Sequence, residues 1–190
     1  MSTDRSATLL DAWWPTTSHA FVRSATVVLV GSLLLTLSAK IQVPFWPVPM
    51  TMQTFAIMVL AAAFGARLGL ATTLFYLAQG AAGLPVFAGT PEKGIGLAYM
   101  MGPTGGYLVG FAIAAYVIGW DRSILRLGTA MLAGHVLVFV PGYIWLAYLI
   151  GPDKAWTFGV MPFLAASVFK TALAALVVPA AWQLTPRRQQ

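Results

Sequence analysis

The sequence predicts an all-α integral membrane protein, a bundle of six transmembrane helices with both chain ends on the cytoplasmic side. Three observations indicate this fold class. Of the 190 residues, 59% are hydrophobic and only 8% are charged, whereas soluble domains have about 25% charged residues. Uncharged stretches recur at the length of about 20 residues that crosses a bilayer. Arginine and lysine separate between alternate connections, as the positive-inside rule requires.

The uncharged stretches divide the chain into helices. A single six-helix membrane domain is predicted over residues 24–186, between a cytoplasmic or interfacial segment, 1–23, and a basic cytoplasmic tail, 187–190. Trp13 and Trp14 predict an interfacial anchor in a segment that is unlike a cleavable signal peptide. The stretches are residues 24–39, 41–66, 68–91, 94–120, 127–152 and 171–186, the last extending back past Lys170.

Charge and tryptophan positions give the orientation. With the N-terminus inside, seven arginines lie in inner segments and three lysines in outer ones, which fits the positive-inside rule. No tryptophan then falls at mid-span, as interfacial preference predicts. The inner arginines are Arg5, Arg23, Arg67, Arg122, Arg126, Arg187 and Arg188, and the outer lysines are Lys40, Lys93 and Lys154. Trp13, Trp14, Trp120 and Trp182 fall near the inner face, and Trp46, Trp145 and Trp156 near the outer face.

The first outer segment, residues 42–49, reads QVPFWPVP. Three prolines so close together forbid a helix. The pattern predicts a stiff aromatic cap that carries Trp46. An ordinary extracellular connector anchored by this tryptophan is the alternative.

The second long outer segment, residues 83–106, contains seven glycines, beginning at Gly83. It is too long and too apolar for a solvated connector, and irregular backbone at membrane depth needs protein or a cavity around it. We therefore predict a re-entrant segment that forms a pocket. Thr104 can cap the fourth helix, so that the N–H groups at its start, at Gly105 and Gly106, face this pocket.

Two glycine pairs, at residues 65–69 and 106–110, have the G-x-x-x-G spacing that lets membrane helices approach closely. We favour packing within the bundle over association with another chain. Gly31 and Ser32 give the first helix a small-residue face, which suits either the bundle or a partner subunit.

Several kinds of chemistry are missing from the sequence. There is no cysteine, no P-loop, no H-E-x-x-H motif and no cluster of carboxylates within the spans. A membrane enzyme is therefore poorly supported, and ATP hydrolysis would have to come from another subunit. The net charge is +6, but in a membrane protein the positions of the positive charges are explained by the orientation in the bilayer. No nucleic-acid partner is therefore predicted. His135, the one histidine within a span, is interpreted as packed or hydrogen-bonded between helices.

Lys170 is the most informative polar residue. A lysine within a span costs about 2.5 to 3.5 kcal/mol and marks a functional site by default. Ser167 lies three residues earlier, on the same helical face. Lys170 can extend toward a site beneath the outer loops, and the alternative is a hydrogen bond to a backbone carbonyl of another helix.

In their order and spacing, several motifs resemble the BioY family, the biotin-binding S components of energy-coupling factor (ECF) transporters. The similarity runs from about Ala39 to Leu173. The motifs are Val48 to Thr54 (VPMTMQT), Gly65 to Gly69 (GARLG), Gly83 to Gly89 (GLPVFAG), Gly102 to Tyr107 (GPTGGY), and Pro162-Phe163 followed by Lys170.

The resemblance implies high-affinity biotin binding and uptake, with a site near the outer face closed by the two long loops. It implies a membrane coupling protein and two ABC-type ATPase subunits as partners, and a place in the bacterial inner membrane. Biotin enters as the transported ligand, and no cofactor is expected. In this site we expect an aromatic wall of Trp46, Phe87 and Tyr107, and polar groups from Gln53, Ser167 and Lys170. Gly83, Gly105 and Gly106 are expected to complete the site, the last two through the N–H groups at the start of the fourth helix.

One position departs from the family. Relatives commonly carry Asp three residues before the lysine of the sixth helix, where this chain has Ser167. Lys170 is then left to meet the carboxylate or the ureido carbonyl of the ligand. Three alternatives stay open: an S component for another small heterocyclic vitamin or precursor, a membrane-embedded enzyme, and a non-binding assembly subunit.

Overall fold

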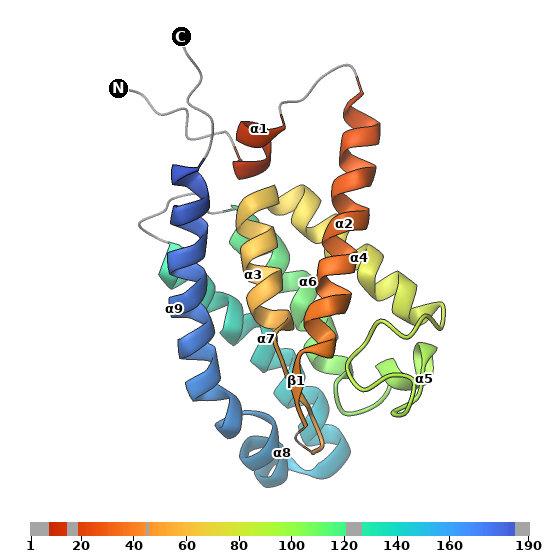
Figure 1. Cartoon of the computed structure of the whole chain (residues 1–190). Coiled ribbons are helices and arrows are strands. Elements are labelled where there is room, and N and C mark those ends of the chain that lie inside the picture. The colour runs from red at the N-terminus through yellow and green to blue at the C-terminus, as the bar shows by residue number, and fades with distance from the viewer. Residues whose placement is uncertain (1–7, 15–18, 45, 121–126, 185–190) are drawn as a thin grey trace.

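The computed structural model describes residues 8–14, 19–44, 46–120 and 127–184, which form helices and one short hairpin (Figure 1). The basic tail predicted at 187–190 lies outside the described residues. The elements are α1 (Leu9–Trp13), α2 (Ala20–Lys40), β1 (Gln42–Val43), β2 (Met50–Thr51), α3 (Gln53–Phe64), α4 (Ala66–Ala81), α5 (Gly96–Met100), α6 (Gly105–Trp120), α7 (Leu127–Ile150), α8 (Pro152–Gly159) and α9 (Met161–Gln183).

Helix lengths differ from the six long spans that the sequence predicts. Within the described residues, three helical segments are long and apolar enough to cross a membrane: Ala20–Lys40, Gly128–Ile150 and Pro152–Ala181. With 12 residues, α3 is about 18 Å long, well short of a hydrocarbon core of about 30 Å. The reason is local, because the proline-rich start of the second stretch forms the β1–β2 hairpin instead of helix.

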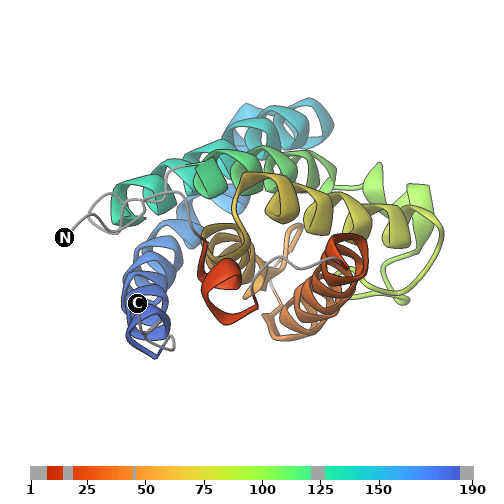
Figure 2. The ribbon, with the colours of Figure 1, turned by 90° about the horizontal axis from the view of Figure 1, so that it is seen from above.

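The helices run between two ends of the molecule. The hairpin, α5 and α8 gather at one end, which we call the loop end, while α1, the α3–α4 junction and the end of α9 lie at the other (Figure 1). Viewed from above, α3 lies between α2 and α9 (Figure 2). It contacts α2, α4, α6, α7 and α9. The short α3 is therefore the centre of the bundle, and its first residues face the loop end.

Close helix packing explains the G-x-x-x-G pair on α6. A Cβ at Gly106 would collide with the Pro141 carbonyl of α7, and one at Gly110 would lie 2.7 Å from the Cα of Val138. The prediction that this pair serves packing within the bundle is confirmed. Gly31 of α2 likewise lies close to Thr72 of α4. The small-residue face of α2 therefore packs within the bundle.

The N-terminal segment is fixed to α2 by an ion pair. Asp11 and Thr8 form a capping box at the start of α1, and the Asp11 carboxylate accepts a 2.8 Å hydrogen bond from the Arg23 guanidinium. Partial burial raises the pKa of the Asp11 carboxyl, but the hydrogen bonds from Thr8 and the nearby Arg23 charge outweigh it and hold the pKa below its ordinary value. The carboxylate is therefore stabilised as the anion.

Replacing Asp11 with asparagine is expected to lower the free energy of unfolding by about 0.5 to 1 kcal/mol at neutral pH, since the Asp11 side chain is partly exposed. A depressed folded pKa stabilises above the unfolded pKa, and this contribution is lost as pH falls through the folded value. Thermal unfolding of both proteins at pH 7 and pH 3 measures it. The difference between them should shrink at pH 3, and an unchanged difference would contradict the ion pair's role.

Candidate functional site

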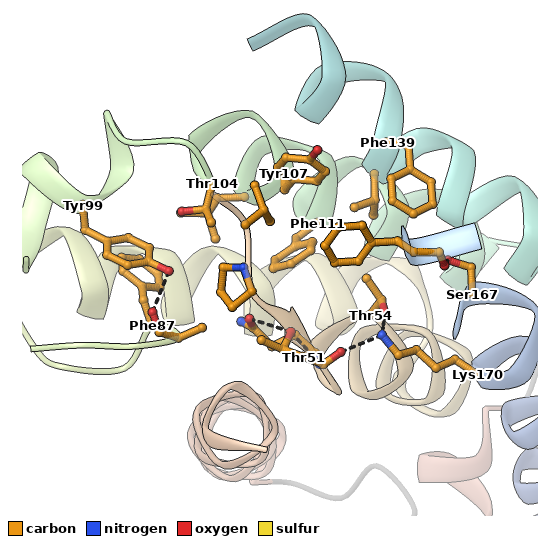
Figure 3. Close-up of a pocket in the computed structure, with 17 residues that line it drawn as sticks. Thr51, Thr54, Phe87, Tyr99, Thr104, Tyr107, Phe111, Phe139, Ser167 and Lys170 are labelled. Carbon is orange, nitrogen blue, oxygen red and sulfur yellow. Dashed lines mark hydrogen bonds between the residues drawn. The ribbon is translucent and has the colours of Figure 1, made fainter. Parts of the chain in front are cut away.

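A pocket opens at the loop end, between the hairpin, the loop after α4, and helices α3, α6, α7 and α9 (Figure 3). It holds about 580 Å³ of empty space, including its open mouth. Most of its wall is apolar or aromatic, and polar groups collect where α3 meets α9. The lining residues are Val48, Pro49, Thr51, Gln53, Thr54, Phe87, Ala88, Tyr99, Thr104, Tyr107, Leu108, Phe111, Val138, Phe139, Phe163, Ser167 and Lys170.

Lys170 lines the pocket and is also hydrogen-bonded. Its ammonium donates to the Thr51 carbonyl at 2.6 Å and to the Thr54 hydroxyl at 3.2 Å, and the side chain is only 7% exposed. The alternative interpretation of the sequence, a hydrogen bond from Lys170 to a backbone carbonyl, is thus present, but its acceptor lies in strand β2 and not in another helix. An ammonium has three donors, so one N–H remains for a ligand, and no carboxylate is among the lining residues.

Ser167 lies beside Lys170 on the wall formed by α9 (Figure 3). Its hydroxyl donates to the Phe163 carbonyl at 2.8 Å, four residues back along the helix. Because this bond uses the one hydroxyl proton, Ser167 is left with acceptor capacity only. The pair therefore offers an N–H donor from Lys170 and an acceptor from Ser167, three residues apart.

Gln53 lines the pocket at the first residue of α3, and both ends of its amide are held. The Tyr76 hydroxyl donates to the Val86 carbonyl at 3.2 Å, so it must accept at 2.7 Å from the Gln53 amide nitrogen. The amide oxygen accepts from Thr51 at 3.1 Å. The sequence prediction missed Tyr76, a tyrosine that is completely buried and orients Gln53.

Phe87 and Tyr99 form the aromatic wall on the side of α5. Their rings stack with centroids 4.9 Å apart, and the Tyr76 ring meets Phe87 edge-on at 5.4 Å. The Tyr99 hydroxyl donates to the Ala88 carbonyl at 2.9 Å. The Phe87 ring lies directly against Gly80 of α4, so this glycine makes room for the wall.

Replacing Gly80 with alanine is expected to displace the Phe87 ring, because the added Cβ would overlap it. Overpacking of this kind costs about 1 to 3 kcal/mol, and the pocket also loses part of its wall. Ligand titration and thermal unfolding together measure the effect. Gly128→Ala is the control, since a Cβ there meets nothing within 4 Å; equal behaviour of the two variants would contradict this role of Gly80.

Tyr107 also lines the pocket, and its hydroxyl donates to the Gly159 carbonyl of α8 at 2.8 Å. The ring is therefore fixed between α6 and the short helix that precedes α9. The sequence-based candidates that line the pocket are Gln53, Phe87, Tyr107, Ser167 and Lys170.

The other four candidates, Trp46, Gly83, Gly105 and Gly106, are not among the lining residues. Trp46 is 73% exposed, with its ring edge-on to Phe158 of α8. Gly83 follows α4 with a φ of 94°. Gly105 and Gly106 are buried in the packing of α6, and the Gly105 N–H donates to the Gly102 carbonyl at 3.0 Å.

Some lining residues were not predicted, although the sequence contains patterns that indicate them. Phe163 precedes Ser167 by four residues and Lys170 by seven, the spacing of a single helical face. Thr51 and Thr54 flank Gln53 within one motif. Phe111 and Phe139 come from α6 and α7, where uniformly apolar sequence gives no indication of the inward face.

His135 is a residue of α7, and its side chain contacts α9. Its Nδ1 is 3.1 Å from the Met131 carbonyl and 3.3 Å from the Thr171 hydroxyl, and the side chain is buried. The interpretation of a packed, interhelically bonded histidine is confirmed. Among the described residues, no group of three or more His, Cys, Asp or Glu side chains is placed to hold a metal ion.

Comparison with known proteins adds the family context. The model of the BioY family matches residues 7–187. A probable biotin transporter BioY of Pyrococcus horikoshii is 35% identical over 155 residues, which cover 82% of this chain and 93% of that protein. The biotin transporter BioY of Thermotoga maritima is 35% identical over 153 residues, 78% of this chain and 89% of that protein.

A solved crystal structure has the same fold. It is the S component for biotin from an ECF-type ABC transporter, and it superimposes with a TM-score of 0.76 at 22% sequence identity. The alignment covers 88% of this chain and 95% of that protein. The arrangement of helices described here is therefore that of an S component.

Proposed function

Because the chain belongs to the BioY family, we propose that it binds biotin and takes part in its uptake as the S component of an ECF transporter. The observation that carries this proposal is the pocket at the loop end, whose apolar wall ends in the polar corner of Lys170, Ser167 and Gln53. A few oriented polar groups in a mostly apolar pocket are typical of small-molecule sites. The chain is an integral membrane protein. Its membership of a family of transporters argues against the alternative of a membrane-embedded enzyme.

Each part of biotin has a matching surface. The thiophane ring and the valeryl chain would lie against the aromatic side chains of Phe87, Tyr107 and their neighbours. Lys170 would donate to the carboxylate or to the ureido carbonyl, and the acceptor of Ser167 suits a ureido N–H. Trp46, on the exposed hairpin, and Gly83, after α4, would act by shaping the loops around this pocket. Gly105 and Gly106 would act by fixing the start of α6 against its neighbours.

We further propose six spans, α2, α3, α4, α6, α7 and α9, within residues 24–186, with both chain ends in the cytoplasm and the loop end outside. Two groups of charged residues support this orientation. Arg23 and Arg67 belong to helix starts at the end opposite the loops, whereas Lys40, Lys93 and Lys154 belong to the loop end. A helix as short as α3 does not cross the hydrocarbon core alone, so the adjoining hairpin and loop would span the remaining thickness of the bilayer. The bacterial inner membrane is the proposed location.

Partner subunits follow from the same proposal. A membrane coupling protein and ABC-type ATPases would supply ATP hydrolysis, because the sequence has no P-loop of its own. Co-purification of the tagged chain with candidate coupling and ATPase subunits tests the proposed association. Recovery of the chain alone under conditions that preserve such assemblies would contradict it.

Competition tests the choice of substrate. Bound radiolabelled biotin should be displaced by unlabelled biotin and not by thiamin or riboflavin at the same concentration. Dethiobiotin retains the ureido ring and the carboxylate but lacks the sulfur, so it measures what the thiophane ring contributes. Displacement by thiamin or riboflavin more strongly than by biotin would favour an S component for another heterocycle.

A further inference from the structure

We propose that Lys40 is a positioning residue that holds the turn at residues 87–90 closed on the pocket and thereby slows release of the ligand. The inference rests on the proposed function, since it concerns the lifetime of the complex in the same pocket. Lys40 is the last residue of α2, and no residue of α2 is among those that line the pocket. Its effect must therefore pass through the segment that it contacts.

The three donors of the Lys40 ammonium are all directed at this one turn. Nζ donates to the Phe87 carbonyl at 3.0 Å, to the Thr90 carbonyl at 3.1 Å and to the Thr90 hydroxyl at 3.1 Å. The Thr90 hydroxyl in turn donates to the Phe87 carbonyl at 2.7 Å. Lys40 itself is exposed, but Phe87 and Thr90 are buried. The cation thus joins the two carbonyls of the turn from α2, a helix that does not line the pocket.

The position of this turn decides the shape of the aromatic wall. Phe87 and Ala88 line the pocket directly. The Ala88 carbonyl receives the Tyr99 hydroxyl, and the Tyr99 ring stacks on Phe87. Since α2 packs along α3 and α4, Lys40 ties the turn to a fixed base. Movement of the turn would displace both rings together.

Removal of the ammonium should make opening of the turn easier. The Phe87 carbonyl would keep only its bonds within the turn, from the Thr90 hydroxyl and the weaker 3.4 Å contact of the Thr90 amide. Loop segments with few internal hydrogen bonds open at low free-energy cost. We expect Lys40→Met to release bound biotin about tenfold faster, the change that loss of hydrogen bonds to a charged group brings.

Lys93 provides a matched control. It is also an exposed lysine at the loop end, and its aliphatic chain lies against Gly89 of the same turn. Its ammonium forms no hydrogen bond with the described residues. Lys93→Met therefore changes the net charge by the same amount as Lys40→Met. It leaves in place the hydrogen bonds between Lys40 and the turn at residues 87–90, which we call the clasp. Stopped-flow dissociation of biotin from the purified protein should be accelerated by Lys40→Met and not by Lys93→Met. Lys40→Arg keeps cationic donors and should restore most of the slow release.

Two further readouts separate positioning from general stability. Thr90→Val removes one acceptor of Lys40 outside the pocket lining, so its effect on release should be less than additive with that of Lys40→Met. Hydrogen exchange of the ligand-free protein should be faster over residues 86–94 in Lys40→Met than in Lys93→Met. This second measurement needs no ligand and therefore tests the clasp even if biotin is not the substrate.

The outcomes are distinct. Unchanged exchange over residues 86–94 in Lys40→Met, or biotin release no faster than from Lys93→Met, would overturn the role of Lys40. Faster exchange together with faster release supports it. Absence of biotin binding by the parent protein, with faster exchange in Lys40→Met, would support the clasp while rejecting the proposed function.

Discussion

Replacing Lys170 with methionine is expected to weaken biotin binding about 10- to 100-fold, the range for losing a hydrogen bond from a charged donor. Methionine keeps the length of the side chain but has no N–H donor. The ligand-free protein should tolerate the change, because it leaves one carbonyl, that of Thr51, and one hydroxyl, that of Thr54, without this donor. Equilibrium titration measures the loss. Lys154→Met, at an exposed lysine of α8, is the control and should bind as the parent does.

The methyl ester of biotin identifies which group Lys170 meets, because it lacks the anionic carboxylate. If the ammonium binds the carboxylate, esterification and Lys170→Met remove the same interaction, and their effects are non-additive. If it binds the ureido carbonyl, the two effects add. A Lys170→Met protein that binds biotin as tightly as the parent would exclude Lys170 from the site.

Replacing Gly106 with leucine is expected to destabilise the protein by at least about 2 kcal/mol, because the packing of α6 on α7 has no room for a side chain. A Cβ there would collide with the Pro141 carbonyl and the Trp145 side chain. The obstacle is partly backbone, so a rotamer change cannot relieve it. Thermal unfolding in detergent should show a clear drop in midpoint, with Gly106→Ala intermediate between parent and leucine variant.

Val109→Leu is the matched control for this helix. Val109 lies three residues further along α6 and is 56% exposed, so an added methylene there meets no packed partner. Its unfolding midpoint should stay close to that of the parent. Equal midpoints for Gly106→Leu and Val109→Leu would contradict the close approach of α6 and α7.

The sequence predicts the helical character and the irregular loops well, because both follow from local chemistry. Apolar runs form α2, α7 and α9, and the prolines at residues 44, 47 and 49 exclude helix, as the structure confirms. Pairing of Gln42–Val43 with Met50–Thr51 was not predicted. It shortens α3, and no local signal marks where a hairpin ends and a buried helix begins in an apolar stretch.

The site was only partly accessible to sequence reasoning. The burial of Lys170 and its shared face with Ser167 follow from helical spacing. Its partner does not, since the Thr51 carbonyl is 119 residues away in the chain and belongs to a backbone that carries no residue-type signal. Lys40 shows the same limit: its charge predicts a side of the membrane, whereas its contacts with residues 87–90 depend on how two distant loops fold together.

The most direct test of biotin binding in the pocket at the loop end is an equilibrium titration of the purified chain with biotin, followed by tryptophan fluorescence or calorimetry. Saturable binding of one biotin per chain is predicted, because the pocket at the loop end brings Lys170, Ser167 and the aromatic wall together. Absence of saturable binding by folded protein, judged by its cooperative thermal unfolding, would contradict it.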